Sequence, residues 1–96
     1  MELEQLRIFT ALAAEGSFSA AGQRLYISHS TVSRAVSALE EELGVRLVER
    51  DNRFIGLTAA GRALFDEAGR LLDMAEEAAA RVRAAAEKEA DKNEIF

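Results

Sequence analysis

The stretch from Phe18 to Leu43 constrains the fold of this chain more than any other. Its pattern is that of two helices joined by a tight turn, because Ser28 suits the N-cap of a second helix and Gly44 follows that helix. Apolar residues recur within the second helix at helical spacing, namely Val32, Val36, Leu39 and Leu43. The pattern predicts a helix that is packed on one side only.

The opposite side of this second helix carries small hydroxyls and one arginine. Ser30, Ser33 and Arg34 all lie in its N-terminal half. Such a face suits the major groove of DNA, because hydroxyls donate to phosphates or base edges and Arg34 can bind guanine O6 and N7 together. An ordinary helical hairpin whose serine-rich face meets only water has the same spacing, so both interpretations stay open here.

The helix before the turn fits the helix-turn-helix pattern. It places Phe18, Ala21 and Leu25 on one side, while Gly22 leaves room for a close crossing and Ile27 fills the turn. A further helix is predicted before it, over residues 2–15, because apolar positions keep helical spacing up to a terminating glycine. That first helix is expected to be scaffold.

The pattern changes after the second helix of the pair. Two short, partly alternating segments, VRLVER and RFIGL, are separated by Asp51 and Asn52, which predicts a β-hairpin with a polar tip. A hairpin directly after a recognition helix is a wing. Arg50 and Arg53 flank its tip, where a long cation reaches phosphates or a narrow minor groove. Solvated charges without a nucleic-acid role are the alternative for both arginines.

A long final helix is predicted from Ala59 to about Glu89, capped by Thr58, with a frayed tail over residues 90–96. At about 1.5 Å per residue it would extend on the order of 45 Å. Its apolar seam alternates steps of four and three residues through Leu64, Ala68, Leu71, Ala75, Ala78, Val82 and Ala85. Because one small domain cannot cover such a seam, we expect a second chain to pair with it. An alanine-rich helix standing alone is the alternative beyond Val82.

Composition narrows the function classes. The 96 residues suit one domain and a modest core, and the absence of cysteine excludes disulfides and thiolate chemistry. No His/carboxylate cluster at catalytic spacing and no Gly-rich phosphate loop is present, so we predict a protein that is not an enzyme and needs no cofactor or metal. No apolar run approaches the roughly twenty residues that a bilayer needs, which predicts a soluble, cytoplasmic chain without a membrane partner.

The net charge of −5 argues at first against a nucleic-acid partner, because cations supply much of the affinity for DNA. The distribution of charge matters more. Several arginines fall in or near the proposed hairpin and wing, namely Arg24, Arg34, Arg46, Arg50 and Arg53. We expect a locally positive face on an acidic body, with weak non-specific binding that salt abolishes.

Taken together, these segments resemble the N-terminal DNA-binding domain of a LysR-type transcriptional regulator. The segments that carry the resemblance are LEQLRIFTALAAEGSFSAAGQRLYIS, STVSRAVSALEEELGVRLVER and LTAAGRAL, in the family's order and without a gap. The resemblance implies a mainly α, winged helix-turn-helix of three helices and a two-stranded wing over residues 1–58, followed by a linker helix over 59–89. It also implies a dimer with antiparallel linker helices that binds an interrupted inverted repeat near a promoter.

The family's DNA-contacting positions fall on His29, Ser30, Ser33, Arg34 and Arg53, and phosphate contacts are expected also from Ser28 and Arg50. The chain departs from the family at four of its positions. His29 stands where Gln is most common and Ser30 where Pro is common, so the base preference there does not carry over. Gly22 replaces the usual Ala and Val48 the usual Phe, which should affect packing. An exposed imidazole that touches nothing is the alternative for His29.

The sequence therefore predicts a sequence-specific DNA-binding module of a bacterial LysR-type regulator, which binds double-stranded DNA as a homodimer. Its dimer contacts are expected at Leu64, Ala68, Leu71, Ala75, Ala78 and Val82. The α/β effector-binding domain of the family is not encoded in these 96 residues, so inducer sensing is not expected of them. The alternative of another class is an interaction protein whose linker helix pairs with a full-length regulator and silences it.

Overall fold

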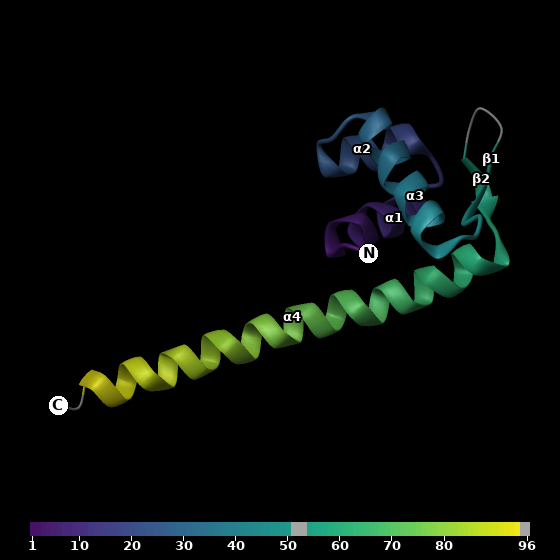
Figure 1. Cartoon of the computed structure of the whole chain (residues 1–96). Helices are drawn as coiled ribbons and strands as arrows, with labels where there is room; N and C mark the ends of the chain where they lie inside the picture. Colours follow the sequence, from purple (N-terminus) through teal and green to yellow (C-terminus); the bar gives the residue numbers. More distant parts are fainter. Residues whose placement is uncertain (51–53, 95–96) are drawn as a thin grey trace.

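The computed structural model describes the backbone of residues 1–50 and 54–94, and the side chains of residues 1–49 and 56–91. Three helices pack together at one end, a two-stranded hairpin stands beside them, and a long helix runs beneath and projects away (Figure 1). The helices and strands are α1 (Leu3–Glu15), α2 (Phe18–Leu25), α3 (His29–Leu43), β1 (Val48–Arg50), β2 (Phe54–Leu57) and α4 (Ala59–Glu94). The predicted mainly α, winged helix-turn-helix with a long final helix is confirmed.

The helix boundaries follow from local capping chemistry. The Ser17 hydroxyl accepts a hydrogen bond from the Ala20 N–H at 3.0 Å, and Ser28 accepts from the Thr31 N–H at 3.1 Å. At the other ends, Gly16 and Gly44 adopt left-handed φ values of 73° and 69°, which a residue with a Cβ adopts at a cost. The caps predicted at Ser28 and Gly44 are therefore confirmed.

The core lies where α1 crosses the other helices. Phe9 and Leu12 of α1 have no exposed surface, and neither do Val32, Val36 and Leu39 of α3. Three of the four residues predicted on the apolar face of α3 are thus buried. The fourth, Leu43, is the last residue of α3 and is 41% exposed.

The base of the wing also belongs to the core. Leu47 and Val48 are 1% and 0% exposed, and β1 pairs with β2 in antiparallel register from Val48 opposite Leu57 to Arg50 opposite Phe54. The register shifts between Glu49 and Arg50, as in a β-bulge. The predicted hairpin is confirmed as far as its described strands, while its tip at Asp51 and Asn52 lies outside the described residues.

Two contacts fix the wing to the helices on either side. The Glu40 carboxylate of α3 accepts from the Leu47 N–H at 2.8 Å, and the Thr58 hydroxyl at the start of α4 donates to the Arg46 carbonyl at 2.6 Å. Thr58 also accepts from the Gly61 N–H at 3.0 Å, which confirms the predicted cap. A Cβ on Gly61 would lie 2.0 Å from the Leu47 carbonyl oxygen, so α4 can begin here only because this residue has no side chain.

The last helix is longer than predicted. α4 continues to Glu94, so both the end at about Glu89 and the frayed tail over residues 90–94 were wrong; residues 95–96 lie outside the described part. The segment lacks apolar periodicity, but its alanine, glutamate and lysine residues are good helix formers without any packing. Within the described residues, no helix combines the length and apolarity needed to cross a membrane.

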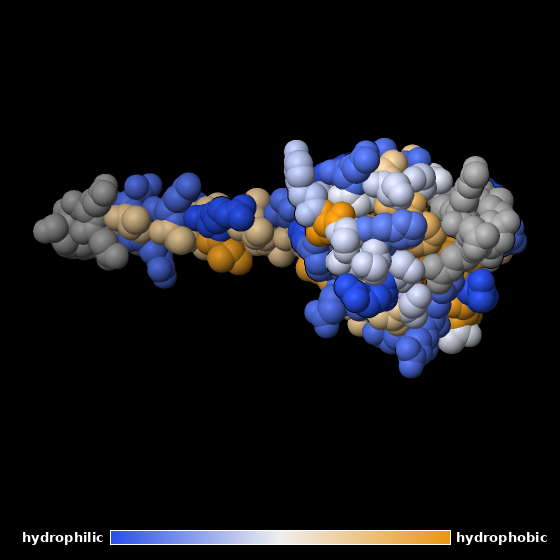
Figure 2. Space-filling model, turned by 90° about the horizontal axis from the view of Figure 1, so that it is seen from above, coloured by the Kyte–Doolittle hydropathy of each residue, from blue (hydrophilic) through white to orange (hydrophobic). Residues whose placement is uncertain are grey.

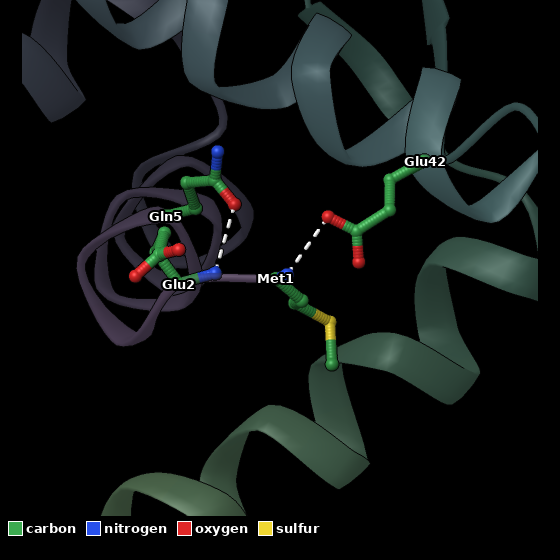
Figure 3. A network of polar contacts seen from close by, with 4 residues as sticks. All are labelled: Met1, Glu2, Gln5 and Glu42. Atoms are coloured by element: carbon green, nitrogen blue, oxygen red, sulfur yellow. Dashed lines mark hydrogen bonds and ion pairs between the residues drawn. The ribbon is translucent and has the colours of Figure 1, made fainter.

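The chain's first residue is tied to the far end of α3. The Met1 amine donates to the Glu42 carboxylate at 2.7 Å, while the Glu2 N–H donates to the Gln5 side chain at 3.0 Å (Figure 3). The hydrogen bond to Glu42 raises the pKa of the Met1 amine above its ordinary value of 8.0. The charged amine therefore links the start of α1 to α3 across the outside of the core.

We predict that this link makes stability depend on alkaline pH. Because pairing raises the folded-state pKa of the amine, its contribution is complete below pH 8.0 and is lost as the pH rises through the raised pKa. The free energy of unfolding in urea is compared for the original chain and Glu42→Gln. The original chain should be the more stable at neutral pH, and the difference should shrink in alkaline buffer.

The matched control is Glu41→Gln, which removes the same charge from the neighbouring exposed position of α3. It should show no such pH-dependent difference. A pH-independent effect of Glu42→Gln would contradict the assigned link.

Candidate nucleic-acid interface

A cluster of hydroxyl groups forms the N-terminal end of α3. Ser28 Oγ lies 2.8 Å from Thr31 Oγ1 and 3.2 Å from Ser30 Oγ, in addition to accepting from the Thr31 N–H. Ser28 and Ser30 are exposed and Thr31 is half-buried. Ser28 therefore serves first as the cap of its own helix, while the hydroxyls it contacts present donors to the outside.

The outward side of α3 is polar and accessible, as predicted. Ser30 and Arg34 are exposed and Ser33 is half-buried, on the side opposite the buried Val32 and Val36. Within the described residues, the Arg34 guanidinium has no ion pair or hydrogen bond. Seen from above, the surface over the three packed helices is mostly pale and blue, with few strongly apolar side chains (Figure 2). The donors on the outward side of α3 are therefore available to an external acceptor.

His29 is held by an aromatic neighbour. Its imidazole stacks on the Phe18 ring with centroids 5.3 Å apart and planes inclined by 8°. Phe18 is buried as the first residue of α2, while His29 is exposed as the first residue of α3. The alternative of an imidazole that touches nothing was wrong. The stack reduces the rotamer freedom of His29 without covering it, which leaves its outer edge free to bind.

One of the five arginines expected on or near this face is already paired within the chain. Arg24 pairs with Glu15 of α1 at 3.2 Å, so a carboxylate already compensates one of the five arginines. Arg50 ends β1, but its side chain lies outside the described residues, as does the whole of Arg53. The roles predicted for the two wing arginines stay predictions.

Gly22 sets how closely α2 and α3 cross. A Cβ on Gly22 would lie 2.7 Å from the Ile27 carbonyl oxygen, and the Ile27 N–H donates to the Gly22 carbonyl at 2.9 Å. The turn between the helices therefore folds directly onto the Gly22 backbone. This contact fixes the position from which α3 begins.

Sequence analysis missed Tyr26, which forms the C-cap of α2. It has φ 59° and ψ 40°, and its side chain is 95% exposed. The available signal was the lack of a glycine between Leu25 and Ser28. A turn this short needs a left-handed residue, and here a tyrosine has to supply it.

The seam of α4 divides into two parts. Leu64 and Ala68, which were predicted as dimer contacts, are 8% and 0% exposed because they pack in the core of their own domain. Farther along, Leu71 and Ala75 are half-buried, whereas Ala78 and Val82 are exposed. Only the part from Leu71 onward is therefore accessible to a second chain. Val82 stands out at 69% exposure.

Acidic residues do not gather into a metal site in the described part of the chain. Its His, Asp and Glu side chains form no group of three or more that could hold a metal ion. The chemistry that the described interface offers is hydrogen-bond donation by hydroxyls, an imidazole and a guanidinium.

These elements define a winged helix-turn-helix domain with a long C-terminal helix. The model of the bacterial regulatory helix-turn-helix proteins of the lysR family matches residues 3–62, and the chain belongs to this family. It is 47% identical over 89 residues to the HTH-type transcriptional regulator ClcR of Pseudomonas putida, a match that covers 93% of this chain and 30% of ClcR. The regulator TcbR of Pseudomonas sp. strain P51 is 46% identical over 86 residues, and 29% of it is covered. The chain thus spans about 30% of the length of these relatives.

Solved structures of similar proteins have the same fold. The CbnR_DBD-DNA complex matches with a TM-score of 0.86 and 46% identity, covering 90% of this chain and 99% of the other. The BenM_DBD/catB site 1 DNA complex matches with a TM-score of 0.84 and 36% identity, covering 90% and 96%. The fold of this chain is that of LysR-family DNA-binding domains. Its relatives are transcriptional regulators rather than enzymes.

The close crossing of α2 and α3 leads to a prediction about stability. Gly22→Ala should destabilise the fold by about 1–2 kcal/mol, because the added Cβ meets a backbone oxygen and the strain exceeds the gain in helix propensity. Gly69→Ala is the matched control, since a Cβ there meets nothing within 4 Å. It should stabilise α4 by about 0.5–1 kcal/mol. Urea unfolding of both variants measures the difference, and equal effects would contradict the assigned crossing.

Proposed function

We propose that this chain is the sequence-specific DNA-binding part of a bacterial transcriptional regulator that acts in the cytoplasm and binds an interrupted inverted repeat as a homodimer. The observation that carries the proposal is the outward side of α3. Its donors are exposed next to a fully buried apolar side, so that the helix is rigidly held but open to an external duplex. The similarity to two domains solved in complex with DNA supports the same assignment.

The donors differ in what they contribute. Arg34 and Ser30 read base edges from the N-terminal half of α3, with His29 beside them, while Arg53 of the wing enters the adjacent minor groove. Ser28, Ser33 and Arg50 donate to phosphates and set the register of α3 on the duplex. In this assignment, specificity rests on few residues and affinity on many.

The accessible part of α4 supplies the homodimer. Leu71, Ala75, Ala78 and Val82 lie along one side, and small alanines permit close approach of a second helix. A two-fold symmetric, antiparallel pair would place the two α3 helices in opposite orientations along one duplex. An inverted repeat is the sequence that such a pair matches.

A second function is favoured by a different observation. The accessible seam lies on α4 and does not depend on α3, and the chain carries a net charge of −5. Such a chain could act as an interaction protein that pairs with a full-length regulator and silences it. It would then bind duplex DNA only as a heterodimer, or not at all.

Selection from duplexes with a randomised centre tests the proposal. The chain alone should enrich duplexes that contain an inverted repeat, and gel shifts should give tighter binding to a selected duplex than to a random duplex of equal length. If the chain alone retains no duplex but a mixture with a full-length relative does, the second function holds. The selected and random duplexes also serve to measure DNA binding by substituted chains.

Arg34→Ala should weaken binding to the selected duplex by about 5- to 150-fold per half-site, the worth of one bidentate contact to guanine. The loss on the random duplex should be much smaller, since that duplex offers no matched base edge. Titration of both duplexes at one salt concentration measures the two losses. Arg83→Ala on α4 removes an equally exposed arginine far from α3 and should leave both affinities unchanged. Equal losses by Arg34→Ala on the two duplexes would refute its base-reading role.

The seam predicts a position-dependent effect of one substitution. Ala78→Asp places a carboxylate in the expected helix-helix contact of both chains, which should weaken the dimer at least about tenfold. Ala80→Asp makes the same change on the other side of the helix and should leave the dimer intact, because residues two apart in a helix point in nearly opposite directions. Ala78 and Ala80 are both exposed and neither belongs to the core, so neither change should disturb it. Sedimentation measures the dimer, and equal dissociation of the two variants would contradict the seam.

A further inference from the structure

Tyr26 occupies a backbone position that does not favour it. Among the described residues it is the one non-glycine residue with a positive φ, 59°. A side chain in this left-handed conformation costs free energy because the Cβ crowds the following carbonyl oxygen. Gly has no such cost and Asn a smaller one, so both are better suited to the position.

Packing within the chain does not offset this cost. The Tyr26 side chain is 95% exposed, so folding removes almost none of its ring from water. Within the described part of the chain, its phenol makes no hydrogen bond and its ring no aromatic contact. Because a different residue would make the fold more stable here, we attribute the tyrosine to a contact with another molecule.

The position of Tyr26 indicates what it meets. It lies between α2 and α3, two residues before the cap Ser28, in the turn that folds onto Gly22. When a helix-turn-helix docks on DNA, its second helix enters the major groove and its first helix crosses the backbone. The turn that joins them then lies beside a sugar-phosphate strand at the edge of the groove.

We propose that Tyr26 is a DNA-backbone anchor, whose phenolic O–H donates a hydrogen bond to a phosphate oxygen at the edge of the groove that α3 enters. The inference rests on the proposed function, since it needs α3 in the groove. A phenol suits this place because its ring can lie against the deoxyribose while its hydroxyl binds an anionic oxygen, which strengthens the hydrogen bond. The side chain stands on the turn and not on α3, so it holds the strand and does not read bases.

The charge of the chain gives such an anchor a particular use. The chain carries a net charge of −5, and Arg24, in the last turn of α2, is already paired with Glu15. A neutral donor binds a phosphate without releasing counterions. Its contribution to affinity therefore persists at salt concentrations that weaken the arginine contacts.

Tyr26→Phe tests the anchor, because it removes only the hydroxyl and keeps the ring and backbone conformation. Affinity should fall by about three- to tenfold per half-site on the selected and the random duplex alike, the worth of one hydrogen bond in each half-site. The slope of log affinity against log salt should stay that of the original chain, since no cation is lost. The melting temperature should not change, because the hydroxyl has no partner within the described residues.

A duplex with single methylphosphonate substitutions locates the contact. At one phosphate in each half-site, methylphosphonate substitution should lower the affinity of the original chain. The same substitution should not lower the affinity of Tyr26→Phe any further, because both changes remove the same hydrogen bond. Tyr26→Gly is the second variant. It should raise the melting temperature by relieving the left-handed backbone and still lose at least as much affinity as Tyr26→Phe.

The possible outcomes separate this anchor from the proposed function. If the original chain binds no duplex, the proposed function fails, and the anchor with it. If the original chain binds and Tyr26→Phe binds equally well, only the anchor is overturned. A loss confined to the selected duplex would also overturn it, because that result would mean base reading and not phosphate binding.

Discussion

The structure depends on the burial of one side of α3 against α1. Val32, Val36 and Leu39 have no exposed surface, and Phe9 and Leu12 of α1 are as completely buried. Their removal from water is the largest favourable contribution that a domain of this size has. The same packing determines which side of α3 stays outside. Ser30 and Arg34 are therefore accessible because the core buries the opposite side of α3, and no other interaction is needed to expose them.

A second constraint connects α3 to α4. The Glu40 carboxylate holds the Leu47 N–H, and Gly61 lets α4 start directly against the Leu47 carbonyl. Leu64 and Ala68 then bury the first turns of α4 in the same core as α3. With α4 fixed to the domain in this way, the angle between α3 and α4 is set within each chain. Pairing through α4 would therefore transmit one geometry to both α3 helices, and so determine the spacing of the two half-sites.

Local features could be predicted from the sequence more completely than tertiary contacts. The caps at Ser28, Gly44 and Thr58 were predictable because capping chemistry acts within a few residues. By contrast, the contact of the Glu40 carboxylate with the Leu47 N–H was not predicted, since only the fold brings the two together. The heptad pattern that includes Leu64 and Ala68 predicted that both side chains are buried. Such a pattern does not distinguish burial in the chain's own core from burial against a second chain. Of the predicted site, the described donors lie where α3 was expected to present them, while the outcome for Arg53 lies outside the described residues.

The acidic character of the chain bears on how such an interface would work. Arg7 and Arg24 are both paired with glutamates, so these two cations are already compensated inside the molecule. Each half-site would then be held by its remaining arginines together with hydrogen bonds from Ser28, Ser30 and their neighbours, which are individually weak. Binding of one half-site would give the second a high effective concentration, so that two weak contacts together produce a tight complex. In a homodimer with this charge, the accessible seam of α4 would matter for affinity as well as the donors of α3.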